Sequence, residues 1–329
     1  MSQLLEVKDL TVAFNGANGA KVRVDGVSFS VNRGEVVCLV GESGCGKSLT
    51  ALSLMGLLPK GGTVSQGEVF LEGRDLLLLS EKEKDRIRGN QMGMIFQDPL
   101  TSLNPVFTIG SQIMESMAAH TRLSKEEARK KAVLLLKRGG IRNAEQVMKQ
   151  YPHTLSGGMR QRVMIAMALV CEPQFLIADE PTTALDVTIQ AQIMNLLWKM
   201  QKENGMGMLL ITHDIGVVAQ MADRVLVMYA GQIVEEATVW ELFQNPKHPY
   251  TRALMQTVPS VYDSSDRVLE AIPGIVPEDY EDLTGCRFAP RCRERCAICE
   301  TVQEDVLFAP GHTAKCMVMK ERDKKYGEK

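Results

Sequence analysis

The chain is 329 residues long, 45% of them apolar, and its 38 basic and 40 acidic side chains give a formal net charge of -2. This length is enough for a full hydrophobic core and predicts two domains, or one large domain with an extension. The balanced charge lacks the basic excess that is typical of nucleic-acid binding. The sequence contains no run of 18 apolar residues, so no transmembrane helix is predicted. The first residues do not resemble a secretion signal, so we expect any membrane role to come through a partner.

The first third of the chain predicts strands. Residues 4–14, 22–31 and 67–73 contain apolar residues that partly alternate with polar ones, which is typical of a half-exposed sheet. Residues 35–41 instead form a short continuous apolar run, which indicates a strand covered on both faces. A glycine-rich loop follows this run directly, and residues 48–58 then predict a helix.

The middle of the chain, roughly residues 105–170, predicts helices. Ser124 and Glu127 have the spacing of a capping box, in which each side chain accepts a hydrogen bond from the other residue's backbone amide. Residues 126–138 then carry an apolar stripe with helical spacing and end before two glycines. The capping box and the stripe together predict one helix that begins just after Ser124.

Two more buried strands are predicted at residues 174–179 and 207–212, with a helix at residues 187–205 between them. A strand, a helix and a second strand in succession predict a right-handed crossover and a parallel sheet. We therefore expect the helical middle of the chain to be inserted between two halves of a parallel sheet.

The composition changes near residue 257, after which prolines, an acidic stretch and five of the eight cysteines follow. In a chain without a secretion signal, this many cysteines argue against a disulfide scaffold. We expect a linker and then a small appendage that gains stability from a metal. The thiols available for it are those of Cys286, Cys292, Cys296, Cys299 and Cys316.

Residues 41–48 match the pattern G-x-x-x-x-G-K-[ST], between a predicted buried strand and a predicted helix. Glycines let successive backbone amides point at one phosphate, and the start of the helix adds its positive end. Lys47 is expected to reach the outer phosphates, and Ser48 to offer its hydroxyl to Mg²⁺. The expected nucleotide contacts of this phosphate loop are Gly41, Ser43, Gly44, Cys45, Gly46, Lys47, Ser48 and Leu49.

Two acidic residues, Asp179 and Glu180, end the predicted strand at residues 174–179. The carboxyl edge of a parallel sheet is where ligands of α/β proteins gather. Asp179 is therefore expected to hold Mg²⁺, directly or through water. Glu180 is expected to polarise the attacking water as a general base.

Residues 155–161, Leu-Ser-Gly-Gly-Met-Arg-Gln, begin another predicted helix and present backbone amides to an anion. Because the phosphate loop already supplies one anion site, a second site in the same chain indicates two chains that share nucleotide. The motif closely resembles the signature of ABC-type ATPases. In that family the cassettes pair head-to-tail, which implies that Ser156, Gly157 and Gly158 close on the ATP held by the other cassette.

The resemblance to ABC-type ATPases covers about residues 4–255. It implies an α/β fold, the P-loop NTPase ABC cassette, with a parallel RecA-like core, an antiparallel β-subdomain and an inserted helical subdomain at about residues 98–165. The nucleotide-binding domain would span residues 1–257 and the cysteine-rich appendage residues 258–329. The implied activity is ATP hydrolysis with Mg²⁺ as cofactor.

Four further residues resemble family elements. Gln97 resembles the glutamine that touches Mg²⁺ and water, and the alternative to this role is an ordinary polar residue in a turn. Asp186, after Ala184, resembles the loop that crosses to the other cassette, and it also fits a helix N-cap. His213 follows a predicted strand and resembles the switch histidine at the γ-phosphate. Phe14 resembles the aromatic that stacks on adenine, with a core aromatic as its alternative.

Beyond the cassette, residues 245–251 resemble the segment that ends the cassettes of peptide and nickel importers, and residues 285–292 resemble the cysteine-bearing tail of that subfamily. This implies an importer of oligopeptides or dipeptides, with nickel or another small solute as the alternative. The implied partners are two transmembrane permeases, a solute-binding protein and a second, paralogous ATPase, or a second copy of this chain. The implied place is the cytoplasmic face of the membrane.

The subfamily pattern implies Cys286, Cys292, Cys299 and Cys316 as ligands of a [4Fe–4S] cluster. Cys296 departs from that pattern and creates a Cys296-x-x-Cys299 spacing that also suits zinc. Iron–sulfur cluster, zinc and no metal therefore all stay open, as does the choice of the spare thiol. The role that we expect for the site is structural.

Two other functions are alternatives to transport. A non-transport ABC ATPase of DNA repair or translation would carry tandem cassettes, long coiled coils or a basic surface, and the sequence contains none of these. A redox or iron sensor that gates the ATPase is the third hypothesis, and the additional Cys296 motivates it. No nucleic-acid partner is expected.

Overall fold

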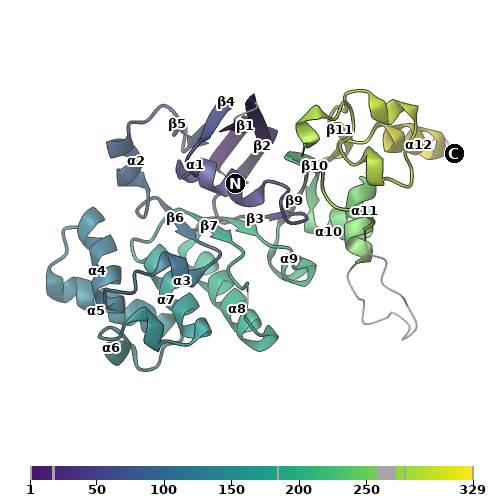
Figure 1. The fold of residues 1–329 in the computed structure, drawn as a ribbon. Helices are drawn as coiled ribbons and strands as arrows, with labels where there is room; N and C mark the ends of the chain where they lie inside the picture. Colours follow the sequence, from purple (N-terminus) through teal and green to yellow (C-terminus); the bar gives the residue numbers. More distant parts are fainter. Residues whose placement is uncertain (1, 17–18, 184, 258–271, 278, 328–329) are drawn as a thin grey trace. The chain divides into compact units, whose positions relative to one another are not determined.

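The structure, a computed structural model, describes residues 2–16, 19–183, 185–257, 272–277 and 279–327 (Figure 1). The chain folds into two compact units. Unit one comprises the residues up to 6 together with 30–36 and 70–211. Unit two comprises residues 7–29, 37–69 and those from 212 onward. None of the helices in the described residues combines the length and the apolarity needed to cross a membrane.

The first sheet has the strand order β2-β1-β4-β5. Buried and exposed positions alternate irregularly along its long strands, as the sequence predicts for a half-exposed sheet. The strand predicted at residues 67–73 is longer than expected, because β4 already begins at Gly62. The strands are β1 (Gln3–Gly16), β2 (Gly19–Asn32), β4 (Gly62–Leu71) and β5 (Arg74–Asp75).

Three fully buried parallel strands form the sheet of unit one. β6 (Met92–Ile95) pairs with β7 (Phe175–Asp179), and β7 pairs with β8 (Gly207–Ile211). Helix α8 (Val187–Asn204) connects β7 to β8. The predicted strand–helix–strand unit with a parallel sheet is therefore confirmed, and it leaves Asp179 at the last paired position of β7.

Along the chain, α2 precedes β6, and the remaining helices of unit one follow β6 and precede β7. Of these, α4, α5 and α6 lie together in one group (Figure 1). The capping box of α5 is confirmed, because Ser124 Oγ accepts from the Glu127 amide at 3.3 Å and a Glu127 carboxylate oxygen accepts from the Ser124 amide at 2.8 Å. The helices are α2 (Glu81–Ile87), α3 (Pro99–Ser102), α4 (Ile109–His120), α5 (Lys125–Arg138), α6 (Ala144–Val147) and α7 (Gly157–Leu169), with a single 3₁₀ turn at Pro152–Thr154.

Unit two contains a run of strands in the order β3-β9-β10-β12-β11. β3 is parallel to β9, and the remaining neighbours are antiparallel. β3 is wholly buried, as its apolar sequence predicts. The strands are β3 (Val36–Val40), β9 (Arg224–Tyr229), β10 (Gln232–Thr238), β11 (Val306–Ala309) and β12 (His312–Ala314).

Unit two also contains five helices and several short turns within the described residues. The cysteine-bearing segment contains three short 3₁₀ turns, at Tyr280–Asp282, Ala289–Arg291 and Ala297–Glu300. The helices are α1 (Lys47–Met55), α9 (Ile215–Met221), α10 (Val239–Gln244), α11 (Pro249–Gln256) and α12 (Met317–Gly327).

The C-terminal segment corrects one expectation. It is not a separate appendage, because β12 pairs with β10 and thereby extends the sheet of unit two. The buried carboxylate of Glu235 on β10 lies 2.8 Å from His312 Nε2 on β12. Composition alone could not reveal this pairing, which joins residues 77 positions apart. The predicted linker after residue 257 lies mostly in residues 258–271, outside the described residues.

Candidate nucleotide-binding site

The phosphate loop leaves the end of β3 and enters α1. A Cβ atom at Gly41 would lie 2.2 Å from the Met228 carbonyl oxygen, so the neighbouring strand end leaves room for glycine alone. Gly46, the residue before α1, has a φ of 109° and has the Arg23 carbonyl 2.9 Å from where a Cβ would be. The Cys45 carbonyl accepts a hydrogen bond from the Gly231 amide at 2.9 Å. The path of the loop thus depends on two glycines that allow close backbone approach and on a backbone hydrogen bond within unit two.

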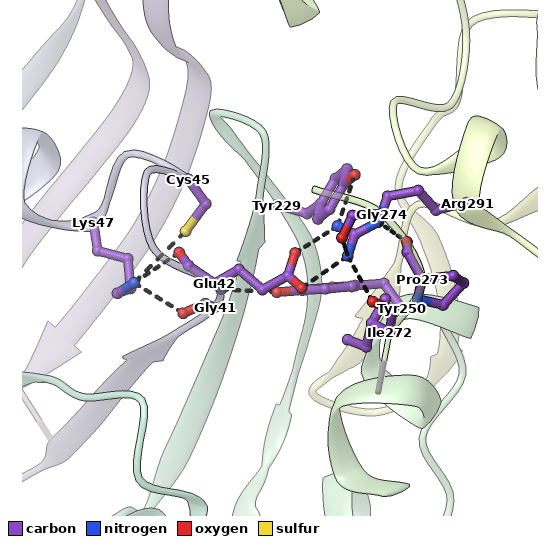
Figure 2. Close-up of polar contacts among 10 residues, drawn as sticks. All are labelled: Gly41, Glu42, Cys45, Lys47, Tyr229, Tyr250, Ile272, Pro273, Gly274 and Arg291. Carbon is purple, nitrogen blue, oxygen red and sulfur yellow. Dashed lines mark hydrogen bonds and ion pairs between the residues drawn. The ribbon is translucent and has the colours of Figure 1, made fainter. Parts of the chain in front are cut away.

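Lys47 is buried inside this loop. Its ammonium group donates to the carbonyl oxygens of Gly41 at 2.8 Å and Glu42 at 3.0 Å (Figure 2). Cys45 is buried, and burial raises the pKa of its thiol, so the side chain stays uncharged and packs in the interior. Ser43 and Gly44 are exposed, and Ser48 and Leu49 are half-buried on the first turn of α1. The loop therefore concentrates backbone amides, one helix start and one cation.

The carboxylates of Asp179 and Glu180 belong to unit one. Asp179 is buried and ends β7, as predicted. Glu180 adopts a φ of 43°, a left-handed conformation that is uncommon for a residue with a side chain and often marks a functional site. One oxygen of Glu180 accepts from Gln97 Nε2 at 3.1 Å and from the Thr183 hydroxyl at 2.9 Å. The structure thus brings together Gln97 and Glu180, which are 83 residues apart.

The signature motif lies at the start of α7. Ser156 is the N-cap, and its hydroxyl accepts from the Met159 amide at 3.4 Å. A Cβ atom at Gly158 would lie 2.9 Å from the Ile189 side chain, so α7 begins against the first turn of α8. Asp186 caps α8 by accepting from the Ile189 amide at 2.9 Å. Unit one therefore places the exposed Ser156 and Asp186 at two neighbouring helix starts, while Ala184 lies outside the described residues.

His213 and Phe14 belong to unit two. His213 is exposed, and the preceding Thr212 amide donates to the Leu39 carbonyl of β3 at 3.4 Å. This contact holds the segment of His213 beside the strand that leads into the phosphate loop. Phe14 is half-buried on β1, and its ring lies 2.8 Å from where a Cβ of Gly62 would be. A role in binding adenine remains a prediction.

Residues 24–183 match the ABC transporter family, and residues 234–299 match the family of oligopeptide/dipeptide transporter C-terminal regions. The oligopeptide transport ATP-binding protein AppD of Bacillus subtilis is 52% identical, over 98% of each chain. The dipeptide transport ATP-binding protein DppD of Haemophilus influenzae is 48% identical, over 95% of this chain and 94% of that protein.

The chain belongs to the ABC transporter family. Within that family it is an ATP-binding subunit with ATPase activity, as its resemblance to ABC-type ATPases implied. The solved dimeric cassette MJ0796, in a post-hydrolysis state bound to ADP and phosphate, has a TM-score of 0.65 and 29% identity to this ABC ATPase. It covers 72% of this chain, and 99% of that cassette is matched. The ABC cassette fold is thereby confirmed.

Three residues of this ABC ATPase that contact site residues escaped the sequence analysis. Tyr250 accepts a hydrogen bond from the Glu42 amide at 2.9 Å, and Thr183 donates to Glu180. Arg291 forms a bidentate ion pair with the Glu42 carboxylate. The proximity of Thr183 to Glu180 was visible in the sequence. No sequence signal pairs residue 42 with residue 250 or 291, because chain folding alone brings them together.

The predicted cysteine ligands of the ABC ATPase do converge. Cys286, Cys292, Cys299 and Cys316 all line one small pocket, whereas Cys296 is exposed and does not line it. Burial raises the pKa of the Cys286 and Cys316 thiols to about 11. Yet among the described residues no group of three or more Cys, His, Asp or Glu side chains is arranged so that it could hold a metal ion. The expected iron–sulfur cluster or zinc is therefore not supported by the arrangement of the side chains.

Proposed function

We propose that this ATPase subunit powers the uptake of oligopeptides or dipeptides across the cytoplasmic membrane. The observation that carries the proposal is the match of one chain to two families, the ABC transporter cassette and the oligopeptide/dipeptide transporter C-terminal region. Relatives named for oligopeptide and dipeptide transport align with nearly the whole chain. The chain would act at the cytoplasmic face of the membrane, held there by two permease subunits. A solute-binding protein would deliver the peptide.

The phosphate loop would bind the triphosphate. Backbone amides at the start of α1 and the Lys47 ammonium group provide positive charge for it. Ser48 and Asp179 would hold the Mg²⁺ that accompanies ATP, with Gln97 touching the same ion. Phe14 would stack on adenine. The position of Asp179 supports its role, because it ends β7 at the carboxyl edge of the parallel strands, where ligands of α/β proteins gather.

Hydrolysis would use Glu180 as the general base that takes a proton from the attacking water. The hydrogen bonds from Gln97 and Thr183 support this role, since they fix the orientation of the carboxylate. His213 would contact the γ-phosphate. Ser156, Gly157, Gly158 and Asp186 would close on the nucleotide of a second, paralogous cassette or of a second copy of this chain.

Uptake by the reconstituted transporter tests the proposed function. The chain, its permeases and its second ATPase are placed in proteoliposomes, and ATP-driven accumulation of labelled peptides is measured. We expect accumulation with this chain and none with Lys47→Ala. That substitution should weaken ATP binding about 10- to 100-fold, because it removes a charged donor to the phosphates. Hydrolysis of ATP with no accumulation of any peptide would exclude peptides as the solute.

We further propose a [4Fe–4S] cluster at the cysteine pocket. The proposal rests on the number and convergence of the thiols, because Cys286, Cys292, Cys299 and Cys316 line one small pocket and a [4Fe–4S] cluster takes four cysteines. One zinc ion would need its four sulfurs within about 4 Å of one another, since each Zn–S bond is about 2.3 Å. Among the described residues no group of side chains is arranged for a single ion, whereas a cluster would bind each cysteine through a different iron. The cluster would supply structural cross-linking of the segment.

Metal content after anaerobic purification tests the cluster. We expect four irons per chain, with the visible absorption of an iron–sulfur centre, and loss of most of the iron in Cys316→Ser, because Cys316 lines the pocket. Cys296→Ser is the matched control, since Cys296 is exposed, and it should keep its iron. Zinc in place of iron, or an equal loss in both variants, would contradict the assignment.

A further inference from the structure

Glu42, the second residue of the phosphate loop, is contacted through three of its groups (Figure 2). Its backbone amide donates to the Tyr250 hydroxyl at 2.9 Å. Its carbonyl oxygen accepts from the Lys47 ammonium group at 3.0 Å. Its carboxylate accepts from both terminal nitrogens of Arg291, at 2.5 and 2.9 Å. Glu42 therefore links the lysine of the loop to the C-terminal segment of the chain.

Arg291 is itself fixed in place. Its side chain is only 6% exposed, and its Nε donates to the Pro273 carbonyl at 2.7 Å. A terminal nitrogen donates to the Gly274 carbonyl at 3.1 Å, and the guanidinium lies 5.7 Å from the centre of the Tyr229 ring. A planar guanidinium held on several sides presents its donors to the Glu42 carboxylate in one geometry. The carboxylate of Glu42 is thus oriented as well as neutralised.

The segment that carries Arg291 is attached to the cassette along its length. Arg287 donates to the Ala230 carbonyl at 2.6 Å, next to the end of β9. The Phe288 ring packs against Tyr229 and Tyr250, with ring centres 5.2 and 5.4 Å apart. Cys286 and Cys292 bracket this segment and line the cysteine pocket. Arg291 therefore reaches the phosphate loop from a segment that is held at both ends.

We propose that Arg291 is a positioning residue for ATP binding, which acts through Glu42 to fix the start of the phosphate loop. The inference rests on the proposed assignment of this loop to ATP. Without Arg291, the carboxylate of Glu42 would be an uncompensated negative charge in a loop that must accept a polyanion. The loop would also have to be ordered at the moment of binding, which lowers affinity. Both effects act on nucleotide affinity.

Equilibrium binding of Mg²⁺ with a non-hydrolysable ATP analogue to the full-length chain tests the proposal by calorimetry. We expect the Kd to rise about tenfold in Arg291→Ala and less in Arg291→Lys, which keeps the charge but not the bidentate geometry. Arg295→Ala is the matched control, because Arg295 pairs with Glu300 on the surface of the same segment. It should bind like the unmodified chain.

A second comparison separates positioning from simple loss of folding. In Glu42→Gln combined with Arg291→Ala, no unpaired carboxylate is left, so the double variant should bind more tightly than Arg291→Ala alone. A general loss of folding predicts no such recovery. An unchanged Kd in Arg291→Ala, or no recovery in the double variant, overturns the positioning role. Lys47→Ala distinguishes the proposals, because normal binding by that variant would instead refute the assignment of the loop to ATP.

Discussion

Replacing Glu180 with glutamine should slow ATP hydrolysis by about 10²–10⁴-fold while the chain still binds ATP. Glutamine has nearly the same shape as glutamate but cannot take a proton from water. The surroundings favour retention of the geometry, because Thr183 can still donate to the side-chain oxygen. The strained φ of Glu180 is a backbone property that the substitution does not alter. The loss should therefore appear in turnover and leave nucleotide affinity within a few-fold.

Phosphate release by the assembled transporter measures this effect, with nucleotide binding measured in parallel. Glu172→Gln is the matched control, because Glu172 also has a positive φ, 56°. Glu172 precedes β7, whereas Glu180 follows it. The Glu172 carboxylate pairs with Lys131 at the surface and is 65% exposed. Turnover of that control should be unchanged. Near-normal turnover in Glu180→Gln would remove Glu180 from the role of base.

The antiparallel strands β11 and β12 form a C-terminal hairpin. Replacing Glu235 with alanine should destabilise this hairpin by about 3–5 kcal/mol, because it removes one partner of a buried ionisable pair. Glu235 is 1% exposed and His312 is fully buried. The Glu235 carboxylate also accepts from the backbone amides of Lys247 and His248, at 2.7 and 2.8 Å. The substitution would thus leave three polar groups without their acceptor in the interior. It would loosen the attachment of β12 to β10.

Amide hydrogen exchange of residues 306–316 measures this loosening, and we expect it to accelerate about 100- to 5,000-fold in Glu235→Ala. Glu300→Ala is the control, because Glu300 pairs with Arg295 at the surface, where an ion pair contributes at most about 1 kcal/mol. Exchange in that variant should be unchanged. Equal protection of the hairpin in Glu235→Ala and the unmodified chain would contradict the role of the pair.

The same carboxylate predicts a pH dependence. Burial raises the pKa of Glu235, but hydrogen bonds from His312 and the amides of Lys247 and His248 outweigh it, so that the pKa is lowered from its ordinary value of 4.5. A lowered pKa in the folded state means that Glu235 contributes stability above pH 4.5, which is lost as the pH falls through the lower folded pKa. Hairpin protection should therefore decline below pH 4.5 in the unmodified chain and less steeply in Glu235→Ala.

Local patterns predicted most of the fold, because their causes are local. The apolar run before Gly41 gave β3, and the spacing of Ser124 and Glu127 gave the start of α5. The motif residues lie at helix starts and strand ends for the same reason, since the chain needs glycine or a cap at those positions. These features depend on neighbours within a few residues, which the sequence displays directly.

Contacts between distant segments were not predictable in the same way. The ion pair joins Glu42 to Arg291, which lies 249 positions later in the chain. Nothing in the sequence around either residue distinguishes it from a charged residue that is exposed at the surface. The cysteine-rich segment was expected to stand apart because its composition resembles a small metal-bound module. Its attachment to the sheet depends on Glu235 and His312, whose burial arises only when β10 and β12 meet. Composition describes a segment but does not identify its neighbours.

The pairing of β12 with β10 also governs what the sheet offers to other molecules. An unpaired strand edge is a template for association with other chains, and long regular edges carry the greatest risk of aggregation. Here the seven-residue β10 is covered, and the outermost strand of the run is β11, which has four residues and an irregularity between Leu307 and Ala309. The C-terminal hairpin therefore leaves only a short, irregular strand at this edge, which disfavours edge-to-edge pairing with other chains.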